Sequence, residues 1–101
     1  MDWIVVALTL LASGTPDDRG LEAVGLARET LARDLGVEAG ALVVRKVEAV
    51  EWPDTSLGCP KKGMLYTQVI VPGYRVVLEY QGRAHHVHVG GGRAVRCTPR
   101  G

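Results

Sequence analysis

Phenylalanine is absent from this 101-residue chain, and its aromatic side chains are two tryptophans and three tyrosines. A core without phenylalanine must be built mainly from aliphatic side chains, so it is thin and would benefit from a covalent staple. Apolar residues make up 47% of the chain and charged residues 23%, which excludes a disordered chain. The length excludes a two-domain enzyme and a long repeat array, and it indicates one small domain.

Motifs that carry catalysis are also missing. No serine lies in a nucleophile elbow, and the triple glycine at 90–92 is followed by Arg93 and Ala94 instead of the lysine and hydroxyl residue of a phosphate loop. Cysteine occurs only twice, without a Cys-x-x-Cys pair for redox chemistry. These absences predict a protein that is not an enzyme and that has no cofactor and no metal.

The net charge of +1 conceals two halves of opposite sign. Residues 1–40 carry three bases and seven acids, whereas residues 41–101 carry nine bases and four acids. The bases of the second half are spread over expected strands and loops, without interleaved aromatic residues. A nucleic-acid partner is therefore not expected.

The N-terminus contains a short apolar run, Trp3–Ala12, followed by the small residues Ser13 and Gly14. This run is too short to span a bilayer, and the small residues suit a signal peptidase, although Asp2 stands where a basic residue is usual. We predict that residues 1–14 are a signal peptide and that residues 15–101 form one domain, secreted or located in the periplasm or cell envelope. A buried first strand is the alternative.

A helix is expected after this segment. Thr15 can cap its first turn, Pro16 suits the first helical position, and Gly36 can provide a left-handed stop. Leu21, Val24, Leu31 and Leu35 recur at helical spacing and define the face expected to be buried, which also carries Arg28 and is adjoined by Ala27. Such a helix needs a packing partner, for which we expect a sheet.

Strands are expected in the second half, where β-branched residues become frequent. Leu42–Trp52 is expected as a long first strand that ends at Pro53, with a bulge near Arg45 and Lys46 because its apolar alternation changes face there. A long loop should follow, up to Gly63.

Later strands are joined by short turns. A strand is expected at 64–71, with turns at Pro72–Gly73 and Gln81–Gly82, and residues 93–97 can return as a short last strand. We predict an α+β domain in which one helix packs on a four-stranded antiparallel sheet.

The two turns fix a register. The expected pairs are Val69–Val76, Thr67–Leu78, Val76–Val87 and Leu78–His85. The face toward the helix would then collect Leu65, Val69, Val71, Tyr74, Val76, Leu78, Val87 and Val89. The opposite face would be polar and exposed to water, with Tyr66, Gln68, Arg75, Glu79, His86 and His88.

Two groups of side chains on this framework are candidates for chemistry. In an exported chain Cys59 and Cys97 are expected to form one disulfide, with free thiols or a metal as alternatives. His86 and His88 share the polar face, with Glu79 nearby as a possible third ligand. Two convergent ligands do not make a metal site, so we expect solvated histidines.

A binding surface is expected in the Trp52–Lys62 loop and on the polar sheet face beside it. Long ordered loops often carry recognition, and a disulfide would hold this one rigid. The candidate binding residues are Trp52, Asp54, Lys61, Lys62, Tyr66, Gln68, Arg75 and His88.

The run from Trp52 to Pro60, Trp-Pro-Asp-Thr-Ser-Leu-Gly-Cys-Pro, followed by Tyr66-Thr-Gln68 and a terminal Cys97, resembles a family of small exported bacterial proteins and lipoproteins that are mostly uncharacterised. This resemblance implies export and a disulfide. The order of elements also resembles cystatin and PepSY domains. Cystatins insert a Gln-x-Val-x-Gly hairpin into papain-like proteases, and Gln68–Gly73 is similar but one residue longer.

Together these observations predict an exported, non-catalytic binding or envelope-associated module. Its partner would be a protein or a component of the cell envelope, and the chain would be a monomer or weak dimer without a transmembrane span. A protease inhibitor of the cystatin or PepSY-propeptide type is the alternative.

Overall fold

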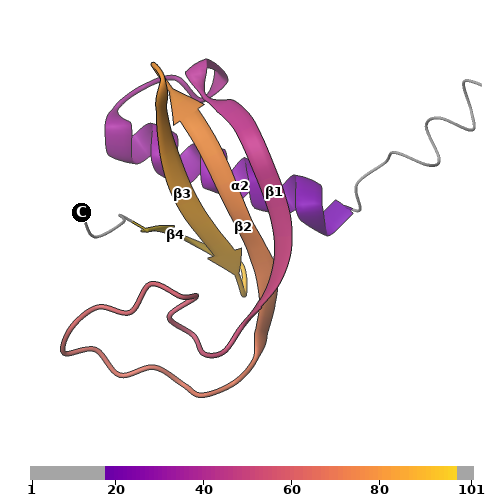
Figure 1. Cartoon of the computed structure of the whole chain (residues 1–101), viewed down its shortest axis with the longest axis vertical. Helices are drawn as coiled ribbons and strands as arrows, with labels where there is room; N and C mark the ends of the chain where they lie inside the picture. Colours follow the sequence, from indigo (N-terminus) through magenta and orange to yellow (C-terminus); the bar gives the residue numbers. More distant parts are fainter. Residues whose placement is uncertain (1–17, 98–101) are drawn as a thin grey trace, which may run out of the picture.

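The computed structural model describes residues 18–97, which form one α-helix, a single 3-10 turn and four strands. In chain order these are α2 (Asp18–Leu35), η1 (Ala39–Ala41), β1 (Val43–Trp52), β2 (Val71–Tyr80), β3 (Arg83–Gly90) and β4 (Arg93–Cys97). The strands make one antiparallel sheet in the order β1-β2-β3-β4, and α2 crosses one face of it (Figure 1). The predicted α+β layout is confirmed. The expected signal peptide and the helix start at Thr15 lie outside the described residues.

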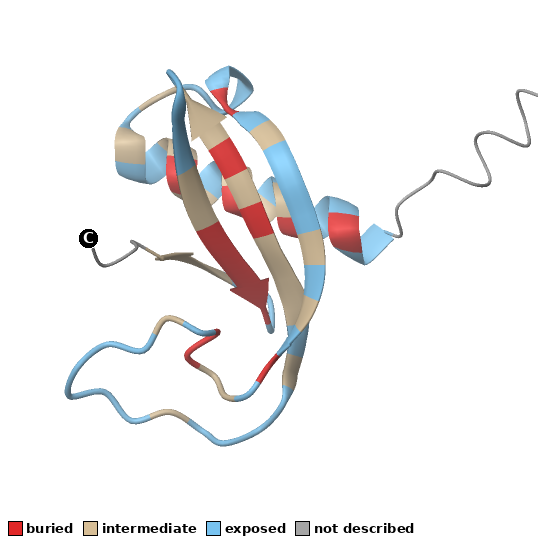
Figure 2. Ribbon diagram, viewed as in Figure 1, coloured by how far each residue is buried: buried red, intermediate tan, exposed pale blue. Residues whose placement is uncertain are grey.

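The helix presents small side chains to the sheet. Ala23, Ala27 and Leu31 recur every four residues and are almost completely buried (Figure 2). Leu21 was expected on this face, but it is 56% exposed because the buried stripe is centred on the alanines. The helix ends as predicted at Gly36, whose φ is 69°, and the Val37 amide donates to the Ala32 carbonyl, as in a Schellman motif.

The core lies between α2 and the middle of the sheet. Alternate residues of β2 and β3 point toward the helix, so Val76 and Leu78 meet Val87 and Val89 there. The pairs Val76–Val87 and Leu78–His85 were both predicted, and both are present. The common reason is the Gln81–Gly82 turn, which fixes the register of this hairpin.

The first strand also follows the prediction closely. Its register with β2 shifts between Val44 and Lys46, which places a bulge at Arg45. After the bulge, Lys46, Glu48, Val50 and Trp52 point away from the helix, as their pairing with β2 shows.

The expected strand at 64–71 is wrong. Residues 53–70 form one long loop without strand structure, and β2 begins only at Val71. Pro72 and Gly73 therefore lie inside β2 instead of forming a turn, and the predicted pairs Val69–Val76 and Thr67–Leu78 do not exist. Leu65 and Val69 are 97% and 49% exposed, not packed on the helix.

The reason for this difference lies in Pro72 and Gly73. The fixed negative φ of proline does not suit the tight primed turns that join hairpin strands. Pro72 lies one residue beyond the last pair of β2 with β3, Gly73–Gly90, where a missing N–H group is tolerated. The hairpin that a cystatin-like inhibitor would insert is thus not formed at these two residues. Within residues 18–97 no helix is long and apolar enough to cross a membrane.

Candidate functional site

A second, smaller core lies on the sheet face opposite α2. Trp52 at the end of β1 and His88 on β3 both point to this face, and their rings stack with centroids 4.4 Å apart. Leu57 of the long loop lies beside them and is 1% exposed. The loop thus closes over one end of the sheet, where Trp52 and His88 would otherwise face water.

Glycines make room for the indole ring of Trp52. Its Nε1 atom reaches past β2 and donates to the Val89 carbonyl at 3.0 Å. A Cβ atom at Gly73 would lie 1.9 Å from that carbonyl oxygen and 2.9 Å from the indole nitrogen. At Gly90 a Cβ atom would meet the Leu57 side chain and Trp52 at 3.0 and 3.2 Å. The sheet can therefore accept the tryptophan only because these two positions lack side chains.

A disulfide fixes the loop to the last strand. Cys59 and Cys97 are bonded, and their Cα atoms lie 5.8 Å apart, within the usual span of such a bridge. The predicted pairing is confirmed. Cys97 pairs with His86 in the β3–β4 register, so the bridge runs from the loop to the sheet face that carries Trp52 and His88.

The environment of His88 differs from the expected solvated one. The residue is 8% exposed, and its Nδ1 atom lies 2.6 Å from the Leu57 carbonyl oxygen and 3.2 Å from the Cys59 sulfur. The carbonyl can only accept, so Nδ1 carries the proton and donates. Burial lowers the pKa of His88, and the Leu57 hydrogen bond opposes this shift in part.

Sequence reasoning missed that the two cysteines lie beside His88. Its nitrogen and the two cysteine sulfurs lie within 4.8 Å of one another, a set of ligand types that zinc accepts when the sulfurs are thiolates. In the disulfide the sulfurs are bonded to each other, so the cluster serves as a structural staple. Glu79, considered as a partner for the histidines, instead pairs with Arg45 at 2.8 Å. No spacing rule could reveal this cluster, because its members come from the loop, β3 and β4.

Arg75 forms the border of this core toward the solvent. Its guanidinium lies 5.5 Å from the Trp52 ring centroid, and one nitrogen is 2.7 Å from a carboxylate oxygen of Glu48. Trp52, Arg75 and His88, predicted as binding residues, are thus brought together. Trp52 and His88 are buried, however, so these two support the loop from beneath and do not face a partner.

The first part of the loop has its own hydrogen bonds. The amide and hydroxyl of Ser56 both donate to one oxygen of Asp54, and the hydroxyl bond is the main reason that the pKa of Asp54 is lowered. The Gln68 side chain also acts on this carboxylate and lowers its pKa slightly further. Thr55 and Thr67 bridge the two sides of the loop, with the Thr55 amide donating to the Thr67 carbonyl and the Thr67 amide donating to the Thr55 hydroxyl. Of the predicted binding residues, Asp54 and Gln68 therefore meet each other.

The outer part of the loop, residues 61–70, is here called the loop tip. Tyr66 accepts a hydrogen bond from the Lys61 amide at 2.9 Å, and both predicted lysines, Lys61 and Lys62, are exposed. Four apolar side chains are exposed as well, with exposed fractions from 49% to 97%: Met64, Leu65, Val69 and Ile70. The sequence analysis placed these residues in a strand, so it did not recognise them as a surface.

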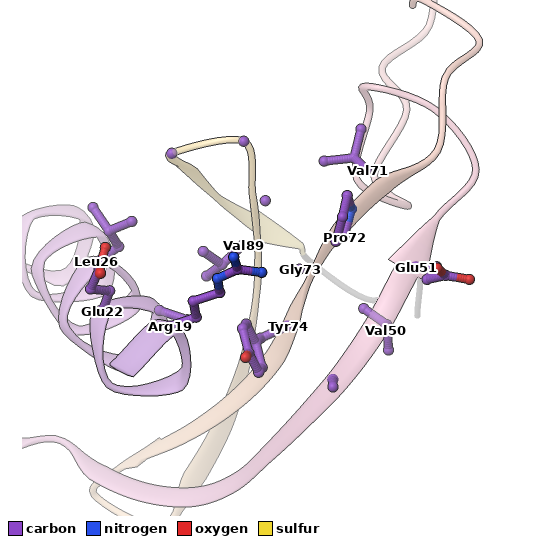
Figure 3. A pocket seen from close by; sticks show the side chains of 15 residues that line it. Arg19, Glu22, Leu26, Val50, Glu51, Val71, Pro72, Gly73, Tyr74 and Val89 are labelled. Atoms are coloured by element: carbon purple, nitrogen blue, oxygen red, sulfur yellow. The ribbon is translucent and has the colours of Figure 1, made fainter. Parts of the chain in front are cut away.

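An apolar groove lies on the other face, between the first half of α2 and the sheet. It has a volume of about 610 Å³ and is bordered by Leu26 and by Tyr74, Val89 and Pro72 of the strands (Figure 3). The Arg19 side chain extends from α2 toward the strands (Figure 3). None of the predicted binding residues lines it. The sequence analysis missed the groove because its walls come from α2, β1, β2 and β3, which only the folded domain brings together.

These features define a class of protein: a small α+β domain in which a disulfide holds a long loop over one end of the sheet. Residues 24–97 match a family described as a domain of unknown function, DUF8738, and the chain belongs to this family. The matched residues run from α2 to Cys97 and include the complete loop and both cysteines. No curated protein matches the chain, and no solved structure matches it.

Proposed function

We propose that this protein is an exported, non-catalytic module that binds its partner through the loop 53–70. The observation that carries this proposal is the exposure of Met64, Leu65, Val69 and Ile70 on one loop. Exposed apolar side chains that gather on a folded protein commonly mark an interaction site, because leaving them in water is unfavourable. The partner would be a protein or a component of the cell envelope.

The attachment of the loop supports the same proposal. The Cys59–Cys97 bridge, the buried Leu57 and the Arg93 bond to the Thr55 carbonyl, at 2.7 Å, hold its base on the sheet. A loop that is ordered before binding loses less conformational entropy when a partner docks. The disulfide also supports export, because such bonds persist mainly in oxidising compartments.

Photo-crosslinking in the native host tests the proposal. A photoreactive amino acid at Leu65, at the loop tip, is expected to capture a partner, whereas the same group at Val43 on β1 is a matched control on an exposed apolar position. Equal capture at the two positions, or capture at Val43 alone, would show that the loop is not the binding surface.

A further inference from the structure

The loop tip combines features that together point to a particular kind of partner. Leu65 is 97% exposed and Ile70 is 68% exposed, so neither contributes appreciably to the core. The fold therefore gives no reason for leucine and isoleucine at these positions. Removal of such side chains from water stabilises a contact in proportion to the apolar area covered, so they favour an apolar environment outside the domain.

The charge of the segment is entirely positive. Residues 59–71 contain Lys61 and Lys62 and no aspartate or glutamate. Neither lysine takes part in an ion pair among the described residues, since the ion pairs present there use Arg45, Lys46 and Arg75. Both ammonium groups are therefore available for external anions.

The shape of the segment distinguishes between possible partners. The outer part of the loop extends away from the helix and the sheet (Figure 1), and its apolar side chains are exposed there. A stable protein interface usually needs a broad surface of about 800 Å² from each partner. Exposed apolar side chains beside lysines on a single projecting loop instead fit the boundary between lipid headgroups and acyl chains, where apolar side chains enter and lysines stay at the headgroups.

We propose that the loop tip binds the surface of an anionic lipid bilayer. Met64, Leu65 and Ile70 enter the headgroup region, and Lys61 and Lys62 contact lipid phosphates. Tyr66, whose hydroxyl accepts from the Lys61 amide, belongs to the same segment, and tyrosine is commonly found at the interface of membranes. This inference rests on the proposed function, because it names the partner of the same loop.

Vesicle co-sedimentation of the full-length oxidised protein tests the inference. The probes are phosphatidylcholine vesicles with and without phosphatidylglycerol. The chain also contains the apolar run at 3–12, so binding by the loop tip is read as the difference between variants of the same full chain. Thermal unfolding of each variant shows whether it is folded.

The double variant Lys61→Ala/Lys62→Ala is expected to bind vesicles that contain phosphatidylglycerol about 25-fold less tightly, at roughly fivefold per lysine. The double variant Leu65→Ser/Ile70→Ser is expected to bind about tenfold less tightly or weaker still. The matched controls remove the same kinds of group elsewhere, as Arg33→Ala/Lys46→Ala and as Leu21→Ser at another exposed leucine. They are expected to bind like the unaltered chain.

Equal vesicle binding by the tip variants and their controls would overturn the lipid assignment. If in addition Leu65 captures a protein in the native host, the proposed binding loop stands with a protein as its partner. Failure of both experiments would overturn both proposals.

Discussion

His88 is an ionisable residue that is buried, with only 8% of its surface exposed. Its neighbours are the Trp52 ring, the Leu57 carbonyl and the Cys59 sulfur, and the charge of Arg75 adds to the effect of burial in lowering its pKa. None of these groups is an acid that would stabilise the imidazolium. The folded domain therefore favours the neutral ring.

A dependence of stability on pH follows. The unfolded chain binds a proton at His88 near its ordinary pKa of about 6.5, whereas the folded chain binds it only at lower pH. The free energy of unfolding is thus expected to decrease as the pH falls below about 6.5, and to continue decreasing until the folded pKa is passed. Urea unfolding at several pH values measures this slope.

The variant His88→Gln is expected to reduce that slope, although it also loses ring stacking. His85→Gln is the matched control, since burial also lowers the pKa of His85, but at a more exposed position. If His85→Gln reduces the pH dependence of the free energy of unfolding more than His88→Gln does, His88 is not the group responsible.

Gly73 shows how one missing side chain permits the second core. Alanine at this position is expected to destabilise the domain by about 2 kcal/mol or more, because its Cβ atom would collide with the Val89 carbonyl and with Trp52. Gly25→Ala is the control, since a Cβ atom there meets nothing within 4 Å and alanine favours a helix by roughly 0.5–1 kcal/mol. Urea midpoints of the two variants should therefore move in opposite directions. A Gly73 variant as stable as the unaltered protein would mean that Trp52 is not held in this position.

The disulfide determines how firmly the loop 53–70 is held. Replacement of both Cys59 and Cys97 by serine is expected to lower the free energy of unfolding by about 4 kcal/mol, the chain-entropy value for their separation of 38 residues. Trypsin should then cleave faster after Lys61 and Lys62, because the loop opens more readily. Chemical reduction of the unaltered protein is expected to give the same two effects. Unchanged cleavage would show that Leu57 and the loop hydrogen bonds suffice to hold it.

The helix and the β2–β3 hairpin could be predicted because their signals are local. Gly36 ends α2, Gln81–Gly82 turns β2 into β3, and the apolar alternation around Val76 and Val87 fixes the buried face. The bulge at Arg45 was also visible, as a change of face in the apolar pattern.

The loop and its small core could not be predicted in the same way. Residues 64–71 have the composition of a strand, but the adjacent Pro72 and Gly73 belong to β2, so the apolar pattern alone placed the strand too early. Trp52 and His88 are 36 positions apart and meet only after the sheet has formed. Predicting that contact would have required the register of three strands together with the fold of the loop.

Export of the protein can be tested on the complete chain. If residues 1–14 are a signal peptide, the protein purified from its native host is expected to begin near Thr15, because Ala12 and Gly14 supply the two small residues that signal peptidase reads before its cleavage point. Intact-mass spectrometry measures this directly. A mass that includes Trp3–Ala12 would favour the alternative, in which this run belongs to the folded protein.

The bulge at Arg45 also bears on how the domain behaves at high concentration. β1 forms an edge of the described sheet, and the unpaired backbone groups of an edge strand can template the addition of a strand from another molecule. The register shift at Arg45 bends this edge, and Lys46, Glu48 and Glu51 place charges along it. A fibril growing from β1 would have to straighten the bend and dehydrate those charges. Deletion of Arg45 would remove the first of these obstacles and expose the domain to amyloid-like stacking.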